Sequence, residues 1–162
     1  MKSVSFLIIG ILIGLGIGYA VWHGQSASGD FEVAVVVRVI DGDTVELADG
    51  RHVRYIGVDT PEVAGSPKGE QPWGKEASAR NRELVERKSV ELQRGERETD
   101  DYGRYLRYVY VDGTFVNAEL ITEGLGRAYT FEAGDRYRQI FVQLEQYAKL
   151  TKKGMWSGVR TP

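Results

Sequence analysis

The most informative absence in this sequence is cysteine, because the chain contains none. It therefore forms no disulfide, has no thiolate nucleophile and cannot bind zinc through sulfur. Histidine is almost as scarce, with only His23 and His52 present. Enzymes built on a histidine base or on paired histidine metal ligands are therefore poor candidates. Any metal bound here is expected to have oxygen ligands.

The chain also lacks an excess of positive charge. It has 21 Lys and Arg residues against 23 Asp and Glu residues, a formal net charge of −2. A broad basic groove is therefore not expected. If nucleic acid is the partner, a few placed Arg or Lys side chains must hold its phosphates, and the affinity should be modest and salt-sensitive.

Residues 4–22 carry no charged side chain, and Lys2 precedes them. The stretch is long enough to span a bilayer and longer than the usual apolar part of a cleaved signal peptide, which favours an uncleaved anchor. Cleavage stays open because Ser26 and Ser28 satisfy the small-residue rule. A buried core helix is disfavoured, since four glycines would weaken it. We therefore expect residues 1–23 to be a signal anchor or a signal peptide.

Both alternatives export the rest of the chain. The domain would be extracytoplasmic, held at the membrane through residues 4–22, or secreted if the leader is cleaved. The mass of the mature N-terminus distinguishes the two. Residues 24–30 are small and polar, as in a linker. Residues 31–162 are about the size of one compact domain, which we expect to be monomeric.

The first part of this domain has the composition of three consecutive strands. Residues 31–40 are rich in β-branched side chains, Asp43 opens a second strand that runs to Leu47, and residues 51–58 form a third with Gly57 near its end. In the first strand, alternation places apolar side chains on one face. That face consists of Phe31, Val33, Val35, Val37 and Val39.

Helical spacing follows a loop over residues 63–73. We expect residues 74–88 to form a surface helix and residues 118–124 a short helix capped by Asn117. The stripe of the first helix is Ala77, Asn81, Leu84 and Val85. Two more strands, residues 89–96 and 105–111, lie between these helices.

A last helix precedes Gly154, and Met155 and Trp156 are expected to pack back onto the body. The stripe of this helix consists of Ile140, Phe141, Leu144, Tyr147 and Ala148. The fold class is therefore α+β, mainly β. We expect a five-stranded barrel of the OB-fold type with about three helices, preceded by the N-terminal transmembrane or signal segment. The strand pattern alone suits several small barrels.

Two aspartates indicate a metal site. Asp43 shares a face with the apolar side chains of its strand, where a carboxylate is costly unless it is paired or metal-bound. Asp59 lies at the end of the third strand, and Pro61 biases Thr60 toward an extended conformation. Two carboxylates and the Thr60 carbonyl suit Ca²⁺. The alternative is a pair of turn-capping aspartates, although Asp41 already accounts for one turn.

Three further residues suit phosphodiester hydrolysis. Glu62 is close enough to Asp59 to act as a general base through a water of the metal shell. Arg54 and Arg104 offer planar guanidinium groups that match phosphate oxygens. Taken singly, these residues are typical of solvated loops and surface ion pairs. Arg54 and Asp59 are also five residues apart, so a regular strand would separate them unless a bulge near Gly57 intervenes.

Taken together, these segments resemble the staphylococcal nuclease family in order and spacing, over residues 33–158. The matching motifs are IDGDT, R-x4-DTPE, WGKEASA, TDDYGR, VNAELITEGLG and K-K-x-x-W-S. The resemblance implies a five-stranded barrel with three helices. It also implies a calcium-dependent nuclease that acts on DNA and RNA and cleaves the bond to the 5′ oxygen, leaving 3′ phosphates.

The resemblance also implies residue roles. Asp43 and Asp59 would bind Ca²⁺ by carboxylate and Thr60 by its carbonyl, with Glu62 as the base or water positioner. The remaining roles are a phosphate clamp and substrate contacts. They fall to Arg54 and Arg104, and to Lys68, Tyr102 and Tyr129, the last by stacking on a base. Asp101 departs from the family, standing where its best-known member has a basic phosphate contact.

Two other functions remain open. One is a non-catalytic OB-type module at the membrane surface that only binds nucleic acid, but family members of this kind usually lose charged site residues. The other is a calcium-stabilised structural domain, which leaves Arg54 and Arg104 unexplained. The complete set of charged residues favours catalysis.

Overall fold

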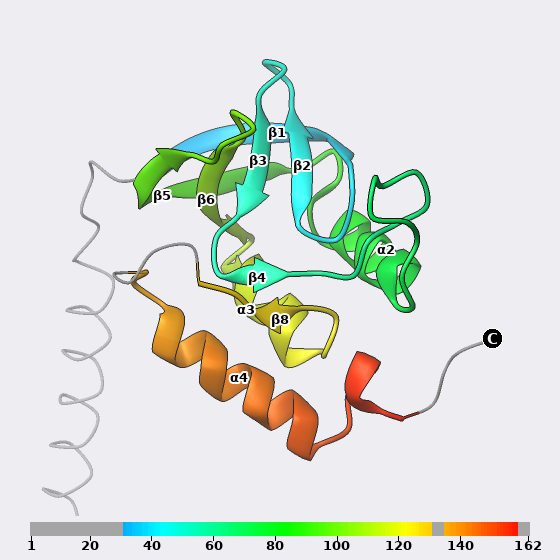
Figure 1. Cartoon of the computed structure of the whole chain (residues 1–162). Helices are drawn as coiled ribbons and strands as arrows, with labels where there is room; N and C mark the ends of the chain where they lie inside the picture. The colour runs from blue at the N-terminus through cyan, green and yellow to red at the C-terminus, as the bar shows by residue number, and fades with distance from the viewer. Residues whose placement is uncertain (1–30, 131–134, 159–162) are drawn as a thin grey trace, which may run out of the picture. The chain divides into compact units, whose positions relative to one another are not determined.

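The computed structural model describes residues 31–130 and 135–158. Five strands form a closed barrel in the order β3-β2-β1-β5-β6, and a parallel pairing of β3 with β6 closes it (Figure 1). Their bounds are β1 (Phe31–Val39), β2 (Thr44–Leu47), β3 (His52–Tyr55), β5 (Ser89–Thr99) and β6 (Tyr105–Val111). The short β7 (Thr114–Phe115) pairs antiparallel with the end of β6. Outside the barrel, β4 (Val58–Asp59) pairs with β8 (Arg127–Ala128). The predicted α+β, mainly β, five-stranded barrel is confirmed.

In the part of the chain that the structure describes, three α-helices accompany the barrel, as predicted. They are α2 (Gly74–Val85), α3 (Val116–Thr122) and α4 (Arg138–Leu150), and the 3₁₀ turn η1 (Gly154–Trp156) follows the last. Among the described residues, no helix is both long and apolar enough to cross a bilayer. The predicted leader and linker, residues 1–30, lie outside the described residues.

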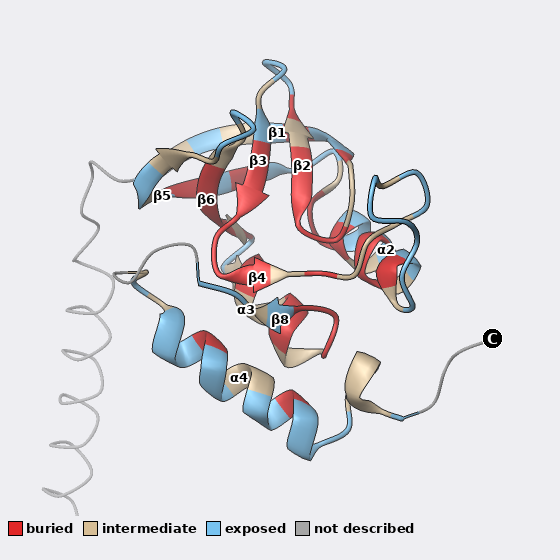
Figure 2. Cartoon of the chain, in the orientation of Figure 1, coloured by how far each residue is buried: buried red, intermediate tan, exposed pale blue. Residues whose placement is uncertain are grey.

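The apolar face predicted for β1 is mostly exposed. Of its five side chains only Val39 is buried, whereas Phe31, Val33, Val35 and Val37 are exposed and the buried Val36 lies outside the predicted set. Figure 2 shows that much of β1 is exposed. The run 33–37 is apolar on both faces, so alternation does not discriminate between them. The pairing of β1 with β2 also shifts register between Val36 and Arg38, which turns the end of the strand relative to its start.

The apolar stripes predicted for two helices agree better with the observed burial. In α2 the stripe Ala77, Asn81, Leu84 and Val85 is buried as expected. In α4 only Phe141 and Ala148 are buried, and Leu144 packs partly against the core. Ile140 and Tyr147 are exposed at 49% and 47%, so the buried stripe of α4 is narrower than predicted.

Asn117 was predicted as a helix cap, and this is also wrong. It lies inside α3, fully buried, and its side chain joins two other parts of the fold. Its amide nitrogen donates to the Ile56 carbonyl (2.8 Å), and its amide oxygen accepts from the Val109 N–H (2.9 Å). An apolar side chain here would leave both backbone groups buried and unpaired.

We therefore expect Asn117→Ala to lower the free energy of unfolding by about 2–3 kcal/mol, since each unpaired buried group costs ~1–3 kcal/mol. Urea titration followed by tryptophan fluorescence measures the change. Glu119→Ala in the same helix is the matched control, because Glu119 is partly exposed and its ion pair with Arg80 is long, at 3.8 Å. Equal stability of the Asn117 variant and the control would contradict this role.

Candidate active site

Asp43 lies in the turn that leads into β2, and its side chain is buried. The Asp43 N–H donates to the Asp41 carboxylate (3.0 Å), which closes the turn. Gly42 allows a close approach here, since a Cβ at this position would lie 2.4 Å from Thr60 Oγ1. Thr60 donates to Asp43 Oδ2 from its N–H (2.7 Å) and its hydroxyl (3.0 Å). The two segments predicted to bind metal therefore meet at Asp43.

Arg54 bridges the two predicted metal-binding carboxylates. Its Nε lies 3.1 Å from Asp43 Oδ1, and Nη2 lies 3.1 Å from Asp59 Oδ1. Its Nη1 donates to the carbonyls of Tyr55 (2.8 Å) and Val58 (2.6 Å). The guanidinium is almost fully buried, so these contacts hold it in one orientation.

A strand break brings Arg54 and Asp59 together. The chain turns at Ile56 and Gly57 between β3 and β4, and Gly57 has a φ of +79° that favours glycine. The sequence predicted a bulge within one strand over residues 51–58. The structure has two strands joined by a turn instead, so the interruption was placed correctly but its form was wrong.

Glu62 is held by neighbours in the loop before α2. Ser66 donates its hydroxyl to one carboxylate oxygen (2.7 Å), and Lys68 Nζ lies 2.9 Å from the other. Burial opposes ionisation of Glu62, but the hydrogen bonds from Lys68 and Ser66 outweigh it and hold the pKa below its ordinary value. The Gln71 N–H donates to the Glu62 carbonyl (2.9 Å). Glu62 is therefore a fixed, ionised carboxylate at neutral pH.

Arg104 is fixed by the turn between β5 and β6. Its backbone N–H and its Nε both donate to the Asp100 carboxylate, at 2.9 and 2.7 Å. Burial opposes ionisation of Asp100, but these bonds hold its pKa below the ordinary value. Tyr102 is 86% exposed, and its ring centroid lies 5.4 Å from the Arg104 guanidinium carbon. Asp101, the departure from the family, pairs with Arg97.

One cavity of about 400 Å³ collects all the residues that the sequence predicted for the site. They are Asp43, Arg54, Asp59, Thr60, Glu62, Lys68, Tyr102, Arg104 and Tyr129. Tyr129 is half exposed and follows β8, where its N–H donates to the Gly57 carbonyl (2.9 Å). Segments from five parts of the chain therefore meet in one place.

The same cavity includes residues that sequence reasoning missed. Asp41, Arg97 and Asp100 also line it. Asp41 was assigned only to the turn, but burial, with a contribution from the charge of Asp43, raises its pKa to about 6. The i, i+2 spacing of the two aspartates in IDGDT was the available signal. This spacing places both carboxylates in the turn between β1 and β2.

The donor set fits a hard divalent cation. Burial and then the negative charge of Asp43 raise the pKa of Asp59, so one guanidinium does not fully balance the carboxylates around it. Oxygen ligands of this kind suit Ca²⁺. Among the described residues, no three His, Cys, Asp or Glu side chains gather into one metal-binding group. A cation here would therefore need water or backbone oxygen to complete its shell.

Comparison with known proteins agrees with this geometry. The family described as "Staphylococcal nuclease homologue" matches residues 52–158, from β3 to just beyond η1. This chain belongs to the staphylococcal nuclease family. Within the family, it is 35% identical to the thermonuclease of Staphylococcus hyicus over 168 residues, covering 97% of this chain and 99% of that protein.

Other family members are longer than this chain. It is 45% identical over 126 residues to endonuclease YncB of Bacillus subtilis (strain 168), covering 74% of this chain and 59% of that protein. It is 43% identical over 126 residues to the SPbeta prophage-derived endonuclease YokF of the same organism, covering 74% of this chain and 42% of that protein. The chain thus spans about half the length of these two relatives.

Proposed function

We propose that this staphylococcal nuclease family member is a calcium-dependent nuclease. It hydrolyses phosphodiester bonds of DNA and RNA at the 5′ oxygen and leaves 3′ phosphates. The observation that carries the proposal is the single cavity in which an ionised Glu62, two fixed arginines and an oxygen-donor site meet. Relatives named endonuclease and thermonuclease support it. In the same proposal, the charge-free residues 4–22 export the domain, which works outside the cytoplasm.

The acidic residues have two different roles, metal binding and proton transfer. Asp43, Asp59 and the Thr60 carbonyl would hold Ca²⁺, which would supply positive charge beside the reacting phosphate. Glu62, ionised and held by Ser66 and Lys68, accepts a proton from the attacking water. The new bond forms between the water oxygen and phosphorus. The bond to the 5′ oxygen breaks, and that oxygen leaves with the bonding electrons and takes a proton from solvent to become a 5′ hydroxyl.

The two arginines bind the phosphate as its negative charge grows. Arg54 is buried and held rigidly, whereas Arg104 is partly exposed and lines the same cavity. Fixed donors need no reorganisation during the reaction, which is why they stabilise the transition state more than water does. Both guanidinium groups act by charge and hydrogen bonding.

Removal of the metal tests the proposal. The full chain, purified in a non-ionic detergent, should cleave a labelled oligonucleotide with CaCl₂. Chelation should reduce the rate at least about a hundredfold, because charge stabilisation at the phosphate is lost, and excess CaCl₂ should restore it. The products should carry 3′ phosphates, which mass spectrometry identifies. Cleavage that persists in chelator, or products with 5′ phosphates, would refute the proposal, and binding without calcium-restored cleavage would indicate the binding module instead.

A further inference from the structure

Arg127 lies one strand away from the predicted metal ligand Asp59. In the antiparallel pair of β4 and β8, these two residues are directly opposite each other. Side chains at opposite positions of an antiparallel pair project from the same face. The exposed Arg127 side chain therefore projects from the face that carries the Asp59 carboxylate, although the proposed mechanism gives Arg127 no part.

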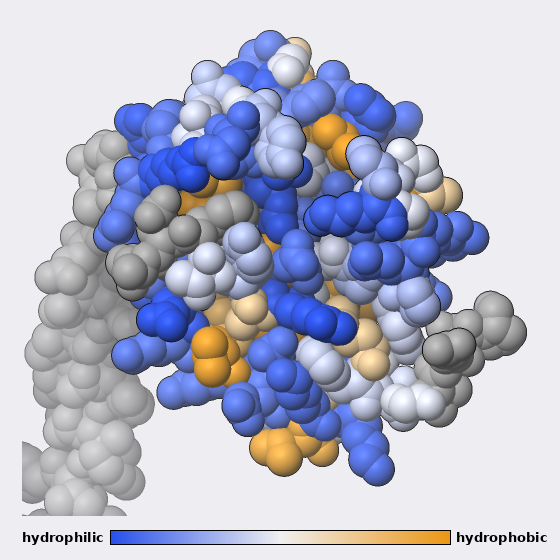
Figure 3. All heavy atoms as spheres, viewed as in Figure 1, coloured by the Kyte–Doolittle hydropathy of each residue, from blue (hydrophilic) through white to orange (hydrophobic). Residues whose placement is uncertain are grey.

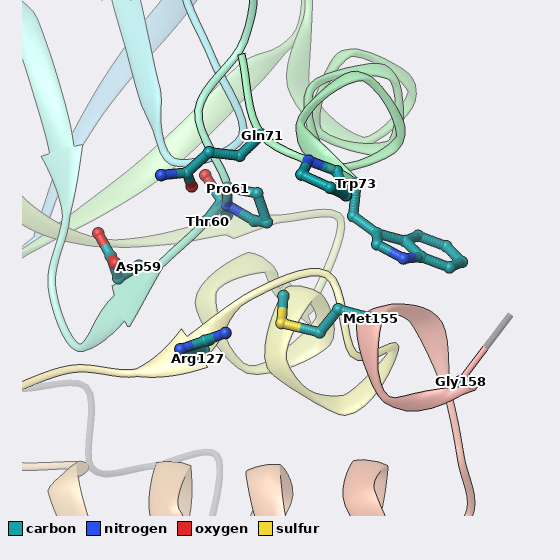
Figure 4. A pocket seen from close by; sticks show the side chains of 9 residues that line it. Asp59, Thr60, Pro61, Gln71, Trp73, Arg127, Met155 and Gly158 are labelled. Atoms are coloured by element: carbon teal, nitrogen blue, oxygen red, sulfur yellow. The ribbon is translucent and has the colours of Figure 1, made fainter. Parts of the chain in front are cut away.

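A second cavity, of about 600 Å³, continues from the active site past Arg127. Asp59, Thr60 and Pro61 line both cavities, so the two are contiguous. Figure 4 shows Arg127 and Met155 on one side, with Gln71 and Trp73 across from them. A volume of this size is within the usual range for small-ligand sites.

The lining of the second cavity suits a nucleotide. Within residues 31–130 and 135–158, Arg127 forms no ion pair, whereas Arg54 and Arg104 are both paired. Its guanidinium carbon lies 5.4 Å from the centroid of the Trp156 ring, which supports the side chain without neutralising its charge. Trp73 and Met155 line the same cavity and contribute apolar surface to a lining that is otherwise mostly polar. A cation and an aromatic ring in one cavity suit a nucleotide, which carries a phosphate and a base.

The protein surface around this cavity is polar, which suits a ligand that enters from solvent. The side of the domain seen in Figure 3 is mostly hydrophilic, with scattered hydrophobic residues. The net charge of the chain is negative, so Arg127, which has no ion pair within the described residues, is not part of a broad basic surface. A strand of nucleic acid bound at the active site would extend toward it.

We propose that the cavity at Arg127 is a subsite for the nucleotide next to the one whose phosphate is cleaved. Arg127 binds the phosphate of that nucleotide, and the surface of Trp73 and Met155 contacts its base. The proposal rests on the proposed nuclease function. Its consequence is that strands long enough to fill both cavities are better substrates than a dinucleotide, which carries a single phosphate.

Kinetics of Arg127→Met on two substrates test the subsite. We expect the KM for a dT₁₂ oligonucleotide to rise about tenfold, the size of effect typical of one charged hydrogen bond. The preference for dT₁₂ over the dinucleotide TpT should fall by a similar factor. The slope of log KM against log salt concentration should become shallower by about 0.7, the contribution of one phosphate contact on a single strand.

Two control variants separate the subsite from general effects. Arg138→Met removes one exposed arginine that lines neither cavity, and it should leave the KM for dT₁₂ and the salt slope as in the wild type. Arg127→Lys should keep the salt slope but recover only part of the affinity. If Arg127 only stabilised η1 through its contact with Trp156, the Arg127→Met variant would have a lower denaturation midpoint but an unchanged dependence of KM on salt. That result, or equal losses on dT₁₂ and TpT, would overturn the proposal.

A binding measurement keeps this test independent of catalysis. Fluorescence anisotropy of labelled dT₁₂ with the full chain in chelator reports the Kd without cleavage. Weaker binding by Arg127→Met than by Arg138→Met supports the subsite even if the wild type proves unable to cleave, in which case only the proposed nuclease function fails. Equal binding by the two variants overturns the subsite even if the nuclease is active.

Discussion

Replacing Glu62 with Gln is expected to lower kcat by about 10²–10⁴-fold and to leave the domain folded, because a positioned general base contributes that much to rate. The amide has nearly the same shape as the carboxylate but cannot accept a proton from the attacking water. The ion pair with Lys68 is lost, but the Lys68 side chain is 71% exposed, and exposed pairs contribute little to stability. Steady-state kinetics on dT₁₂ with calcium measure the loss, and circular dichroism checks the fold.

Glu70→Gln is the matched control for this variant. Glu70 lies in the same loop and pairs with Lys75 at 3.0 Å, but it lines neither the active-site cavity nor the one at Arg127. The two substitutions therefore remove the same charge from similar ion pairs. Near-normal turnover by Glu62→Gln, or a loss equal to that of Glu70→Gln, would remove Glu62 from the mechanism. Global unfolding of Glu62→Gln would show that it is a structural residue.

Replacing Gly57 with Ala is expected to lower the free energy of unfolding by about 3–5 kcal/mol, from backbone strain and from overpacking. Gly57 has a φ of +79°, and an added Cβ would lie 2.2 Å from the ring of the buried Phe141. The turn at Gly57 also orients Arg54, through the carbonyls of Tyr55 and Val58. We therefore expect lower activity as well, even at temperatures where the variant is folded.

Gly50→Ala separates the two causes of this loss. Gly50 has a φ of +84°, close to that of Gly57, but nothing lies within 4 Å of an added Cβ. Its variant should lose only about 1–2 kcal/mol, the cost of the left-handed backbone for a residue with a side chain. Urea unfolding curves of both variants measure the difference. Equal losses would show that contact with Phe141 contributes nothing.

The sequence predicted the structure best at positions where a residue type is compatible with few environments. Asp43 precedes an apolar strand, where a carboxylate is costly unless it is paired or metal-bound. The structure buries Asp43 in contact with Arg54, which agrees with that argument. Arg54, taken alone, was typical of a surface ion pair, but it is buried as well. The barrel could be predicted for a similar reason, since short β-branched segments separated by turns have few stable arrangements.

The sequence was least informative where side chains of one type occupy both faces of an element. The valines of β1 fit either face, and with the register shift between Val36 and Arg38 one buried valine, Val39, belongs to the predicted set and the other, Val36, does not. Asn117 has side-chain chemistry suited to a cap, but its actual partners are Ile56 and Val109, which no local pattern connects to it. Asp41 was assigned to a turn, and its place in the cavity depends on packing around it.

By itself, the sequence determined which groups are available for chemistry: oxygen donors, two candidate phosphate-binding arginines and one candidate base, with no cysteine and almost no histidine. These follow from residue types and short spacings alone. Only the tertiary structure decided how they meet. The turn at Gly57 sends β4 out of the barrel to pair with β8, which places Arg127 beside Asp59. Such a pairing depends on backbone hydrogen bonds between distant segments, and no local sequence pattern encodes it.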